Sequence, residues 1–321
     1  MINMLLNNEN QALLAAFGQL AAFAGTCFFM AKCSKFLPKD GGRDFAYDGK
    51  LSAGKPRGAG IIFILMFTAA SLIFMPIDIE ILIYLILIVA EMLTGYMDDA
   101  SEKPWGEYKK GILDLIIATI LAVNYLHFNS STIEIATLGI HINIPPVLFG
   151  LLTVILVWGS INVTNCDDGV DGLSGTLTII TLATFYVIDH IKGKPDEFTN
   201  LILVFIICIL GYLWYNATPS RLLMGDAGSR AMGVFISIAA LKSGSPVLFL
   251  PAAAVIILDG GLGLIKVALI RGFKIHILKN VRTPLHDHVR KVMGWSNTQT
   301  VSRFAIIQIV ISLAVVYILL L

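Results

Sequence analysis

Long runs of hydrophobic residues, separated by short polar stretches, recur along the whole chain of 321 residues. A hydrocarbon core about 30 Å thick is crossed by roughly 20 apolar residues of helix, and the runs approach this length without strict alternation. Lipid leaves no water to satisfy backbone groups, so such runs predict membrane-spanning helices. About ten spans are predicted, at residues 11–31, 58–76, 79–97, 111–127, 146–163, 174–190, 199–214, 230–243, 246–269 and 303–321.

The composition agrees with an all-α integral membrane protein. Hydrophobic residues make up 56% of the chain and charged residues 14%, with a mean hydropathy of +0.80. Soluble domains carry about 25% charged residues, so that class is excluded. The four cysteines lack metal-type spacing, which argues against a zinc site or a disulfide framework. Without a repeat or a second domain, residues 1–321 form one polytopic domain, and we expect no nucleic-acid partner.

Lysine and arginine gather in alternate loops. The loops at 32–57, 98–110, 215–230 and 270–302 are basic, whereas the loop at 128–145 has neither residue. The other loops on that opposite side hold only Lys192, Lys194 and Lys242. Because basic loops stay in the cytoplasm, the sequence predicts that both termini lie outside and that the basic loops lie inside. The first apolar run lacks the flanks of a cleaved signal peptide and is expected to remain as a span.

Three groups of carboxylates fall in loops on the predicted cytoplasmic side. Asp98 and Asp99 end the third span, the segment 165–172 joins the fifth and sixth, and the segment 224–229 joins the seventh and eighth. A charge inside the membrane costs about 2.5–3.5 kcal/mol on insertion scales, so carboxylates at span ends usually have a function. One aspartate could simply solvate a loop end. Three groups on one face favour an active site there.

The chemistry of these loops indicates phosphoryl transfer. Carboxylate oxygens suit Mg²⁺, which binds one or two carboxylates together with substrate phosphates. Neighbouring glycines allow backbone N–H groups to approach an anion. Repulsion between Asp98 and Asp99 can raise the pKa of one of them and make it a usable base. The basic loops can hold a diphosphate, and Mg²⁺ can neutralise charge on the leaving group.

The same loops resemble the polyprenyl-phosphate N-acetylhexosamine-1-phosphate transferase superfamily. The resemblance rests on the order Asp98-Asp99, then Asn165-Cys-Asp-Asp168-Gly-Val-Asp171-Gly-Leu, then Met-Gly-Asp226-Ala-Gly-Ser. It begins at Gly54 and covers most of the chain. In the last basic loop, Thr-Pro-Leu-His286-Asp-His288, followed by Gly-Trp-Ser and Arg-Phe, is similar to the muramoyl-pentapeptide branch of that superfamily.

The resemblance implies a role for each matching residue. Asp226 would ligate Mg²⁺, Asp98 would act as the base or as a nucleophile, and Asp99 would support the metal or the lipid phosphate. His286 and His288 would hold phosphate and belong with the catalytic set. The implied substrate-binding residues are Lys50, Lys110, Asn165, Asp168, Asp171, Asn216, Leu223, Asp259 and Lys266.

Two of these expectations depend on helical geometry. If 168–171 is helical, Asp168 and Asp171 share a face. Asp259 and Lys266 lie seven residues apart in the ninth span, about two turns, and would also share a face. They form either a buried ion pair or part of the site. Glu91, seven residues before Asp98, is expected to be structural.

The chain departs from the family pattern at several positions. Asp287 replaces the middle residue of a histidine triplet, and Leu223 stands where an aromatic residue would stack on uracil. Lys55-Pro-Arg57-Gly-Ala-Gly replaces Thr-Pro-Thr-Met-Gly-Gly, and Asp114 stands where glutamine is expected. The metal and diphosphate residues are unaltered.

The implied reaction joins undecaprenyl phosphate to the phosphosugar of UDP-N-acetylmuramoyl-pentapeptide, with Mg²⁺, to give lipid I and UMP. The resemblance also implies a homodimer in the bacterial cytoplasmic membrane and sensitivity to nucleoside natural-product inhibitors. A transferase that uses UDP-N-acetylglucosamine as its donor, for teichoic acid or surface polysaccharide, remains an alternative. So does a cation-coupled transporter, although transporters place such residues near the bilayer midplane within repeats. One-step attack and a covalent Asp98 intermediate both remain open.

Overall fold

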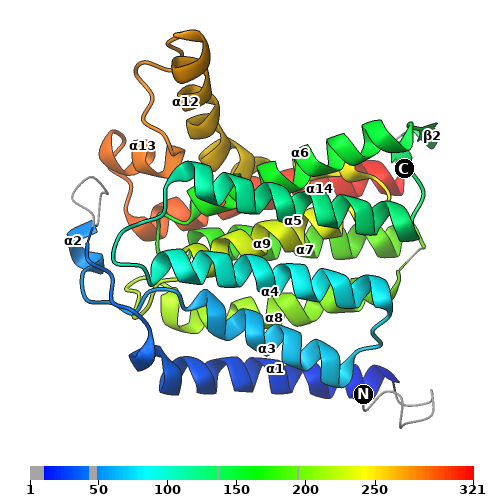
Figure 1. Ribbon diagram of the computed structural model, residues 1–321, viewed down its shortest axis with the longest axis horizontal. Helices are drawn as coiled ribbons and strands as arrows, with labels where there is room; N and C mark the ends of the chain where they lie inside the picture. The colour runs from blue at the N-terminus through cyan, green and yellow to red at the C-terminus, as the bar shows by residue number, and fades with distance from the viewer. Residues whose placement is uncertain (1–10, 43–48, 136–137, 194) are drawn as a thin grey trace.

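The protein is a bundle of long helices that run side by side (Figure 1). The computed structural model describes residues 11–42, 49–135, 138–193 and 195–321. Its helices are α1 (Gln11–Cys33), α2 (Gly49–Ser52), α3 (Gly60–Phe74), α4 (Ile79–Asp99), α5 (Glu107–Phe128), α6 (Pro146–Asp167), α7 (Leu173–Ile191), α8 (Glu197–Asn216), α9 (Gly225–Lys242), α10 (Phe249–Ala252), α11 (Ala254–Ile256), α12 (Leu262–Phe273), α13 (Leu285–Lys291) and α14 (Asn297–Leu320). Shorter turns of helix are η3 (Ser34–Phe36), η4 (Pro246–Leu248) and the π-helical η5 (Ile257–Gly261).

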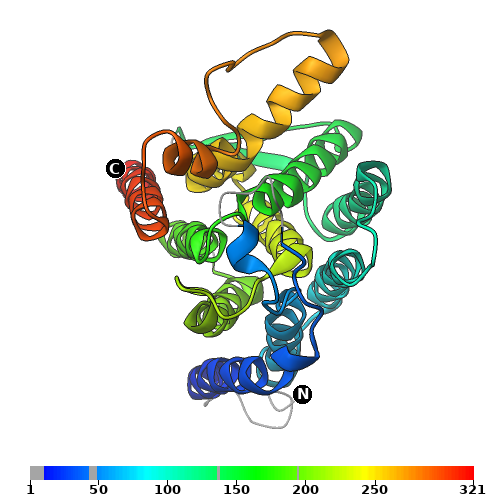
Figure 2. The same ribbon diagram turned by 90° about the vertical axis from the view of Figure 1, so that its left-hand side faces the viewer.

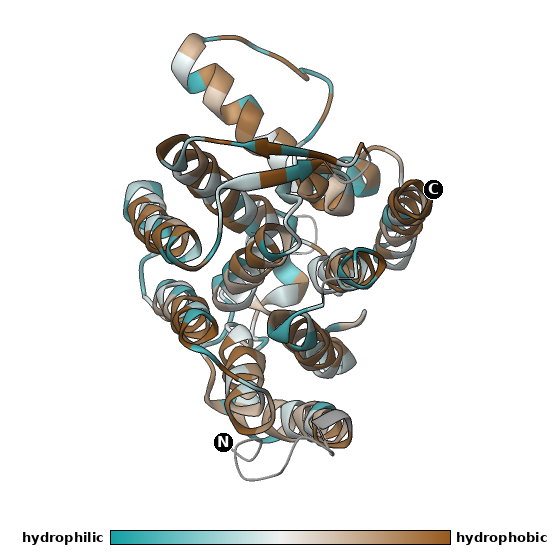
Figure 3. Cartoon of the chain, turned by 90° about the vertical axis from the view of Figure 1, so that its right-hand side faces the viewer, coloured by the Kyte–Doolittle hydropathy of each residue, from teal (hydrophilic) through white to brown (hydrophobic). Residues whose placement is uncertain are grey.

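The prediction of an all-α membrane protein is confirmed in its main feature. Seven of the described helices are long and apolar enough to cross a membrane, or eight spans if one bent pair counts as one. Large hydrophobic side chains such as Leu20, Ile155 and Leu313 are more than half exposed on the outside of the bundle, and hydrophobic residues predominate along the helices (Figure 3). A surface this apolar suits lipid rather than water. The count of ten spans stays a prediction, because α3 has only 15 residues and α9 is not apolar enough.

Helix α9 lies at the centre of the bundle, surrounded by other helices (Figure 2). Every residue from Gly225 to Leu241 is buried. Glycines allow the close packing: a β-carbon added to Gly60 of α3 would lie 2.0 Å from the backbone nitrogen of Gly228. Protein rather than lipid therefore surrounds α9, and the helix can carry charged residues that a lipid-facing helix excludes.

The span predicted at 246–269 is a bent pair of helices rather than one straight helix. The chain bends by 72° between Pro246–Ala252 and Ala254–Phe273. Pro251 removes a backbone donor near the bend. The backbone groups freed there are satisfied by side chains, since Gln308 accepts from the Val255 N–H (2.9 Å) and donates to the Pro251 carbonyl (3.1 Å). Beyond the bend, α12 leaves the bundle and stands apart from it (Figures 1 and 2).

The three acidic loops meet at one end of the bundle, as the span order predicted. In Figure 1 this end, on the left, also holds α2 and α13. At the other end lie the end of α14 and a two-stranded antiparallel hairpin, β1 (Thr132–Ile135) and β2 (Ile140–Asn143), in which Thr132 pairs with Asn143. Among the described residues, this hairpin is the only β-sheet. Which end faces the cytoplasm stays a prediction.

Candidate active site

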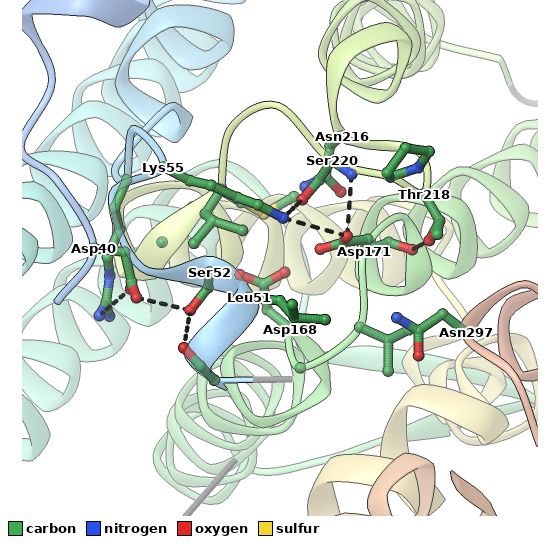
Figure 4. Close-up of a pocket in the computed structure, with 18 of the residues that line it drawn as sticks. Asp40, Leu51, Ser52, Lys55, Asp168, Asp171, Asn216, Thr218, Ser220 and Asn297 are labelled. Atoms are coloured by element: carbon green, nitrogen blue, oxygen red, sulfur yellow. Dashed lines mark hydrogen bonds and ion pairs between the residues drawn. The ribbon is translucent and has the colours of Figure 1, made fainter. Parts of the chain in front are cut away.

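A cavity of about 470 Å³ opens at the loop end of the bundle (Figure 4). This volume is in the range of small-molecule binding sites. Six residues singled out from the sequence line it, and so do several that were not. The predicted residues are Asn165, Asp168, Asp171, Asn216, Leu223 and Asp226, and the additional ones include Asp40, Lys55, Arg57, Ser220 and Arg290.

One wall of the cavity is the connection between α6 and α7. Residues 168–172 form turns rather than a helix, so the expected helical face shared by Asp168 and Asp171 is absent. The reason is local backbone geometry, since Asp168 leaves the helical region (ψ 56°) and Gly172 has a positive φ of 84°. Asn216 at the end of α8 holds this turn, because its Oδ1 accepts from the Gly172 N–H (2.8 Å) while its Nδ2 donates to the Leu222 carbonyl (2.9 Å).

The facing wall carries an ionic contact across the cavity. Lys55 Nζ donates to Ser220 Oγ (2.8 Å) and lies 3.9 Å from Asp171 Oδ2, which also accepts from the Ser220 N–H (3.2 Å). Figure 4 shows these groups converging from three segments. Leu223 is fixed nearby by backbone bonds: its N–H donates to the Pro56 carbonyl at 2.8 Å. The two walls are thus tied by the segment 55–57.

Three carboxylates share two cations at the inner side of the cavity. Lys110 Nζ bridges Asp98 Oδ2 and Asp226 Oδ2, the latter at 2.9 Å. Arg57 bridges the other pair, with Nε donating to Asp99 Oδ1 (2.8 Å) and a terminal nitrogen 3.5 Å from Asp226 Oδ1. The predicted convergence of Asp98, Asp99 and Asp226 from separate turns is therefore present. We call these five residues the catalytic network, after the role that we propose for them.

Electrostatics keep Arg57 charged in this half-buried place. Burial alone would lower the pKa of its guanidinium, but Asp99, Asp226 and Asp40 together raise that pKa above its usual value. Asp40 lies 3.5 Å from Arg57 and also accepts from Ser52 Oγ at 2.8 Å. Arg57 thus holds a permanent positive charge beside the cavity, where a diphosphate would be attracted.

Glycines let α4 and α9 approach closely enough to form the catalytic network. A β-carbon added to Gly95 would lie 2.4 Å from the carbonyl oxygen of Asp226, and one on Gly225 would lie 2.2 Å from Asp99 Oδ2. Gly225 also has φ 71°, a conformation that glycine favours. Asp99 Oδ2 accepts from the Ala227 N–H (3.1 Å), so its carboxylate sits at the positive N-terminal end of α9.

The oxygen-rich network fits Mg²⁺ as a site completed by substrate. No group of three or more His, Cys, Asp or Glu side chains that could hold a metal ion occurs in the part of the chain that the structure describes. The carboxylates instead contact Arg57 and Lys110. Mg²⁺, however, commonly binds one or two carboxylates together with phosphates. Asp226 meets this requirement, because it lines the cavity; its Oδ1 lies 3.5 Å from Arg57, and its Oδ2 contacts Lys110 at 2.9 Å.

His286 and Asp259 form a buried pair behind the cavity rather than part of its lining. Asp259 accepts from the backbone N–H of His286 and lies 2.6 Å from its ring Nδ1 as well. Both side chains are at most 4% exposed. The other ring nitrogen lies against Gly169, where an added β-carbon would be 2.2 Å away. The pair therefore supports the 168–172 turn from beneath.

The remaining predicted residues lie outside the cavity lining. Lys50 is exposed on α2, and His288 accepts from the Arg282 N–H at 3.3 Å. The expected ion pair between Asp259 and Lys266 is not formed. Lys266 donates instead to the carbonyls of Leu278 and Val281, because the π turn at Ile257–Gly261 breaks the regular α-helical spacing between Asp259 and Lys266.

Asp287, the residue that interrupts the histidine pattern, faces cations on its own helix. It accepts from Arg290 (2.8 Å) and Lys291 (3.1 Å). Burial would raise the pKa of its carboxyl, but the hydrogen bond from Lys291 and the nearby positive charges lower that pKa below its usual value. Arg290 in turn donates to the Gly169 carbonyl (3.2 Å) and lines the cavity. Asp287 thus orients an arginine towards the site.

Asp40, Lys55 and Arg57 were not predicted as members of the site. Lys55 and Arg57 carry a signal in the sequence, because they lie in a basic loop and depart from a family motif. The spacing of residues along the sequence does not predict that a residue of the first loop lies between carboxylates of α4 and α9. Arg57 reaches them because its neighbours Pro56 and Ala59 pair through their backbones with Leu223, in the segment preceding α9.

The helical bundle, its charged loop end and the catalytic network define a polytopic membrane transferase of the phosphosugar type. Residues 81–244 match the family described as glycosyl transferase family 4, and the chain belongs to this family.

The chain is similar over nearly its whole length to phospho-N-acetylmuramoyl-pentapeptide-transferases. It is 38% identical to that of Treponema pallidum over 318 residues, which cover 94% of this chain and 88% of the relative. It is 29% identical to that of Symbiobacterium thermophilum (78% of each chain) and 28% identical to that of Campylobacter jejuni (93% and 95%).

Proposed function

We propose that this protein transfers phospho-N-acetylmuramoyl-pentapeptide from its UDP nucleotide to undecaprenyl phosphate, giving lipid I and UMP. One observation carries the proposal: Asp98, Asp99 and Asp226 share Lys110 and Arg57 beside a cavity of suitable size. The near full-length similarity to the named transferases supports the same reaction.

The cavity would hold the nucleotide and the diphosphate. Asn165, Asp168 and Asp171 offer polar groups along one wall, and Leu223 offers an apolar surface opposite. Lys55, Arg57 and Arg290 supply positive charge for the phosphates. Undecaprenyl phosphate would keep its tail in the bilayer and bring its phosphate to the catalytic network, so that both charged reactants meet at the rim of the membrane.

Asp226 would hold Mg²⁺, with Asp98 and Asp99 close by, and the bound ion would neutralise charge on the diphosphate and on the departing UMP. Lys110 contacts both Asp98 and Asp226, so it fixes the distance between base and metal ligand. Asp98 would accept the proton of the lipid phosphate, or attack the β-phosphorus itself in a two-step route. Asp99 holds Arg57 and the first turn of α9 in place.

We infer that the catalytic end faces the cytoplasm of a bacterial cell and that the membrane is its cytoplasmic membrane. The described parts of the basic loops, 32–42, 49–57 and 270–302, lie at this end, in keeping with the positive-inside rule. UDP-linked donors are made in the cytoplasm, so this orientation gives the cavity access to them. A homodimer remains an expectation from the family resemblance.

Release of UMP by purified protein tests the proposal. Undecaprenyl phosphate is supplied with UDP-N-acetylmuramoyl-pentapeptide or with UDP-N-acetylglucosamine, each with Mg²⁺ and with excess chelator. We expect UMP only from the muramoyl-pentapeptide donor and only with Mg²⁺. If only UDP-N-acetylglucosamine yields product, it is the donor in place of the muramoyl-pentapeptide nucleotide. No product from either, with protein shown to be folded, would refute the transferase proposal.

A further inference from the structure

A second set of charged side chains lies deeper in the bundle than the catalytic network. Arg230 Nε donates to Glu91 Oε1 (2.7 Å), and another guanidinium nitrogen of Arg230 donates to Asp114 Oδ1. Asn162 Nδ2 donates to the second oxygen of Asp114 (3.2 Å). Glu91, Asp114 and Arg230 are each at most 2% exposed. We call these three residues the buried triad.

Each residue of the buried triad lies on the same helix as one residue of the catalytic network, with the charges exchanged on α5 and α9. Each residue of the buried triad is separated from its counterpart in the catalytic network by four or seven residues, which is about 6 or 10 Å along a helix, and lies deeper in the bundle. Residues at these spacings lie on one face of a helix. The pairs are Asp226 and Arg230 on α9, Lys110 and Asp114 on α5, and Asp98 and Glu91 on α4.

Arg230 in the buried triad, like Lys110 in the catalytic network, lies between two acids, but the two sets differ in their surroundings. The catalytic network reaches the cavity through Arg57 and Asp226, whereas no residue of the buried triad lines it. Glu91 Oε2 has no hydrogen-bond partner among the described residues. A buried ionic triad of this kind often stabilises a fold no better than apolar residues of the same volume. Stability alone therefore explains its presence poorly.

Arg230 also acts on the catalytic network through its charge. It lies one turn from Asp226, and its guanidinium interacts electrostatically with that carboxylate. Such a charge favours the ionised carboxylate but opposes a second cation at the same place. Glu91 and Asp114 hold the guanidinium in position and partly offset its charge. The triad can thus set both the position of Asp226 and its strength as a metal ligand.

We propose that Glu91, Asp114 and Arg230 are positioning residues that hold α4, α5 and α9 in register and tune cation binding at Asp226. The inference rests on the proposed Mg²⁺-dependent transfer. It assigns a role to Arg230 and Asp114, and it replaces the expectation that Glu91 is merely structural. None of the three residues lines the cavity, so none needs to contact substrate.

The test compares Arg230→Gln with Arg230→Lys, which keeps the charge. Ser237→Ala is the matched control, because Ser237 is buried on the same helix and bonds only its own helix, at the Val234 carbonyl. Mn²⁺ is titrated into each solubilised protein with UMP present, and its binding is followed by electron paramagnetic resonance. kcat and KM are measured separately, so that metal binding has a readout independent of turnover.

We expect Arg230→Gln to bind Mn²⁺ about tenfold more tightly, since a neighbouring positive charge is lost, and kcat to fall at least about tenfold. Arg230→Lys should bind Mn²⁺ within about twofold of the unaltered protein, and Ser237→Ala should match it in both measurements. A change in KM alone would contradict a positioning role.

A triple variant without the three charges provides a second test if Arg230→Gln does not fold. In Glu91→Gln/Asp114→Asn/Arg230→Gln all three charges are removed together, so Mn²⁺ affinity should return to within about threefold while kcat stays low. Variants that lose only thermal stability, with unchanged metal binding and kcat, would overturn the inference. So would an absence of saturable Mn²⁺ binding in the unaltered protein. Failure of the transferase proposal is distinct, because the unaltered protein would then release no UMP.

Discussion

The carboxylate of Asp259 lies 2.6 Å from both the backbone nitrogen and the ring Nδ1 of His286. This buried carboxylate accepts two hydrogen bonds from His286, which attach α13 to the π turn of the broken span. Replacing Asp259 with asparagine should lower the free energy of unfolding by about 1.5–3 kcal/mol, because hydrogen bonds to a charged group are lost in a dry environment. Thermal unfolding of purified protein measures the change.

Asp287→Asn is the matched control for Asp259→Asn. Asp287 lies next to His286 but is partly exposed, and exposed ion pairs contribute at most about 1 kcal/mol. Its replacement should therefore alter unfolding much less. Equal destabilisation by the two variants would mean that the Asp259–His286 pair is not what anchors α13.

Gly95→Ala should disturb the catalytic network through backbone packing. The added β-carbon would meet the Asp226 carbonyl at 2.4 Å, so α4 and α9 must move apart. Overpacking of this kind costs about 1–3 kcal/mol, and turnover per folded molecule should fall as well. Gly159→Ala on α6 is the control, because nothing lies within 4 Å of its added carbon. Similar turnover in both variants would argue against the close contact.

Asp226→Asn should abolish transfer without unfolding the protein. Loss of the carboxylate charge removes the proposed metal ligand, and we expect kcat/KM to fall at least about 100-fold. The amide keeps the size of the side chain, so membrane insertion and thermal unfolding should change little. Near-normal turnover in purified Asp226→Asn would refute the metal role.

Asp98→Asn should also stop turnover, but through loss of the base. Positioned acid–base groups contribute about 10²–10⁴-fold to rate, so a fall of that size is expected, with Mn²⁺ binding largely retained. Incubating the unaltered protein with radiolabelled nucleotide donor alone then separates the two routes. Label trapped on Asp98 would exclude one-step attack, and its absence under conditions of full activity would exclude the covalent intermediate.

Much of the fold and of the site could be predicted because both depend on local sequence. Apolar runs of about 20 residues predicted the helices. The alternation of basic loops predicted that the three acidic turns lie at one end of the bundle. The failures arose where tertiary structure overrode local pattern. Gln308 and Thr181 satisfy backbone groups near Pro251 and so permit a bend that hydropathy does not reveal.

Side-chain partners were the least predictable part of the site. Spacing indicated that Asp259 and Lys266 face one way, yet Asp259 contacts His286 and Lys266 contacts backbone carbonyls. Arg57 contacts α4 and α9 although it lies in the first loop, because backbone pairing across the cavity brings it there. Such contacts join segments far apart in the chain, and one sequence carries no direct signal for them.

The enclosure of α9 has a consequence for how the protein is made. On insertion scales an arginine or an aspartate at the centre of a lone helix costs about 2.5–3.5 kcal/mol. This is an upper bound for Asp226 and Arg230, which lie in the first two turns of α9. A nascent α9 carrying Asp226 and Arg230 would therefore enter lipid poorly by itself. Because α3, α4, α5 and α6 precede it in the chain, they can be in the bilayer first. Assembly of the membrane domain and completion of its catalytic centre would then be a single biogenesis step.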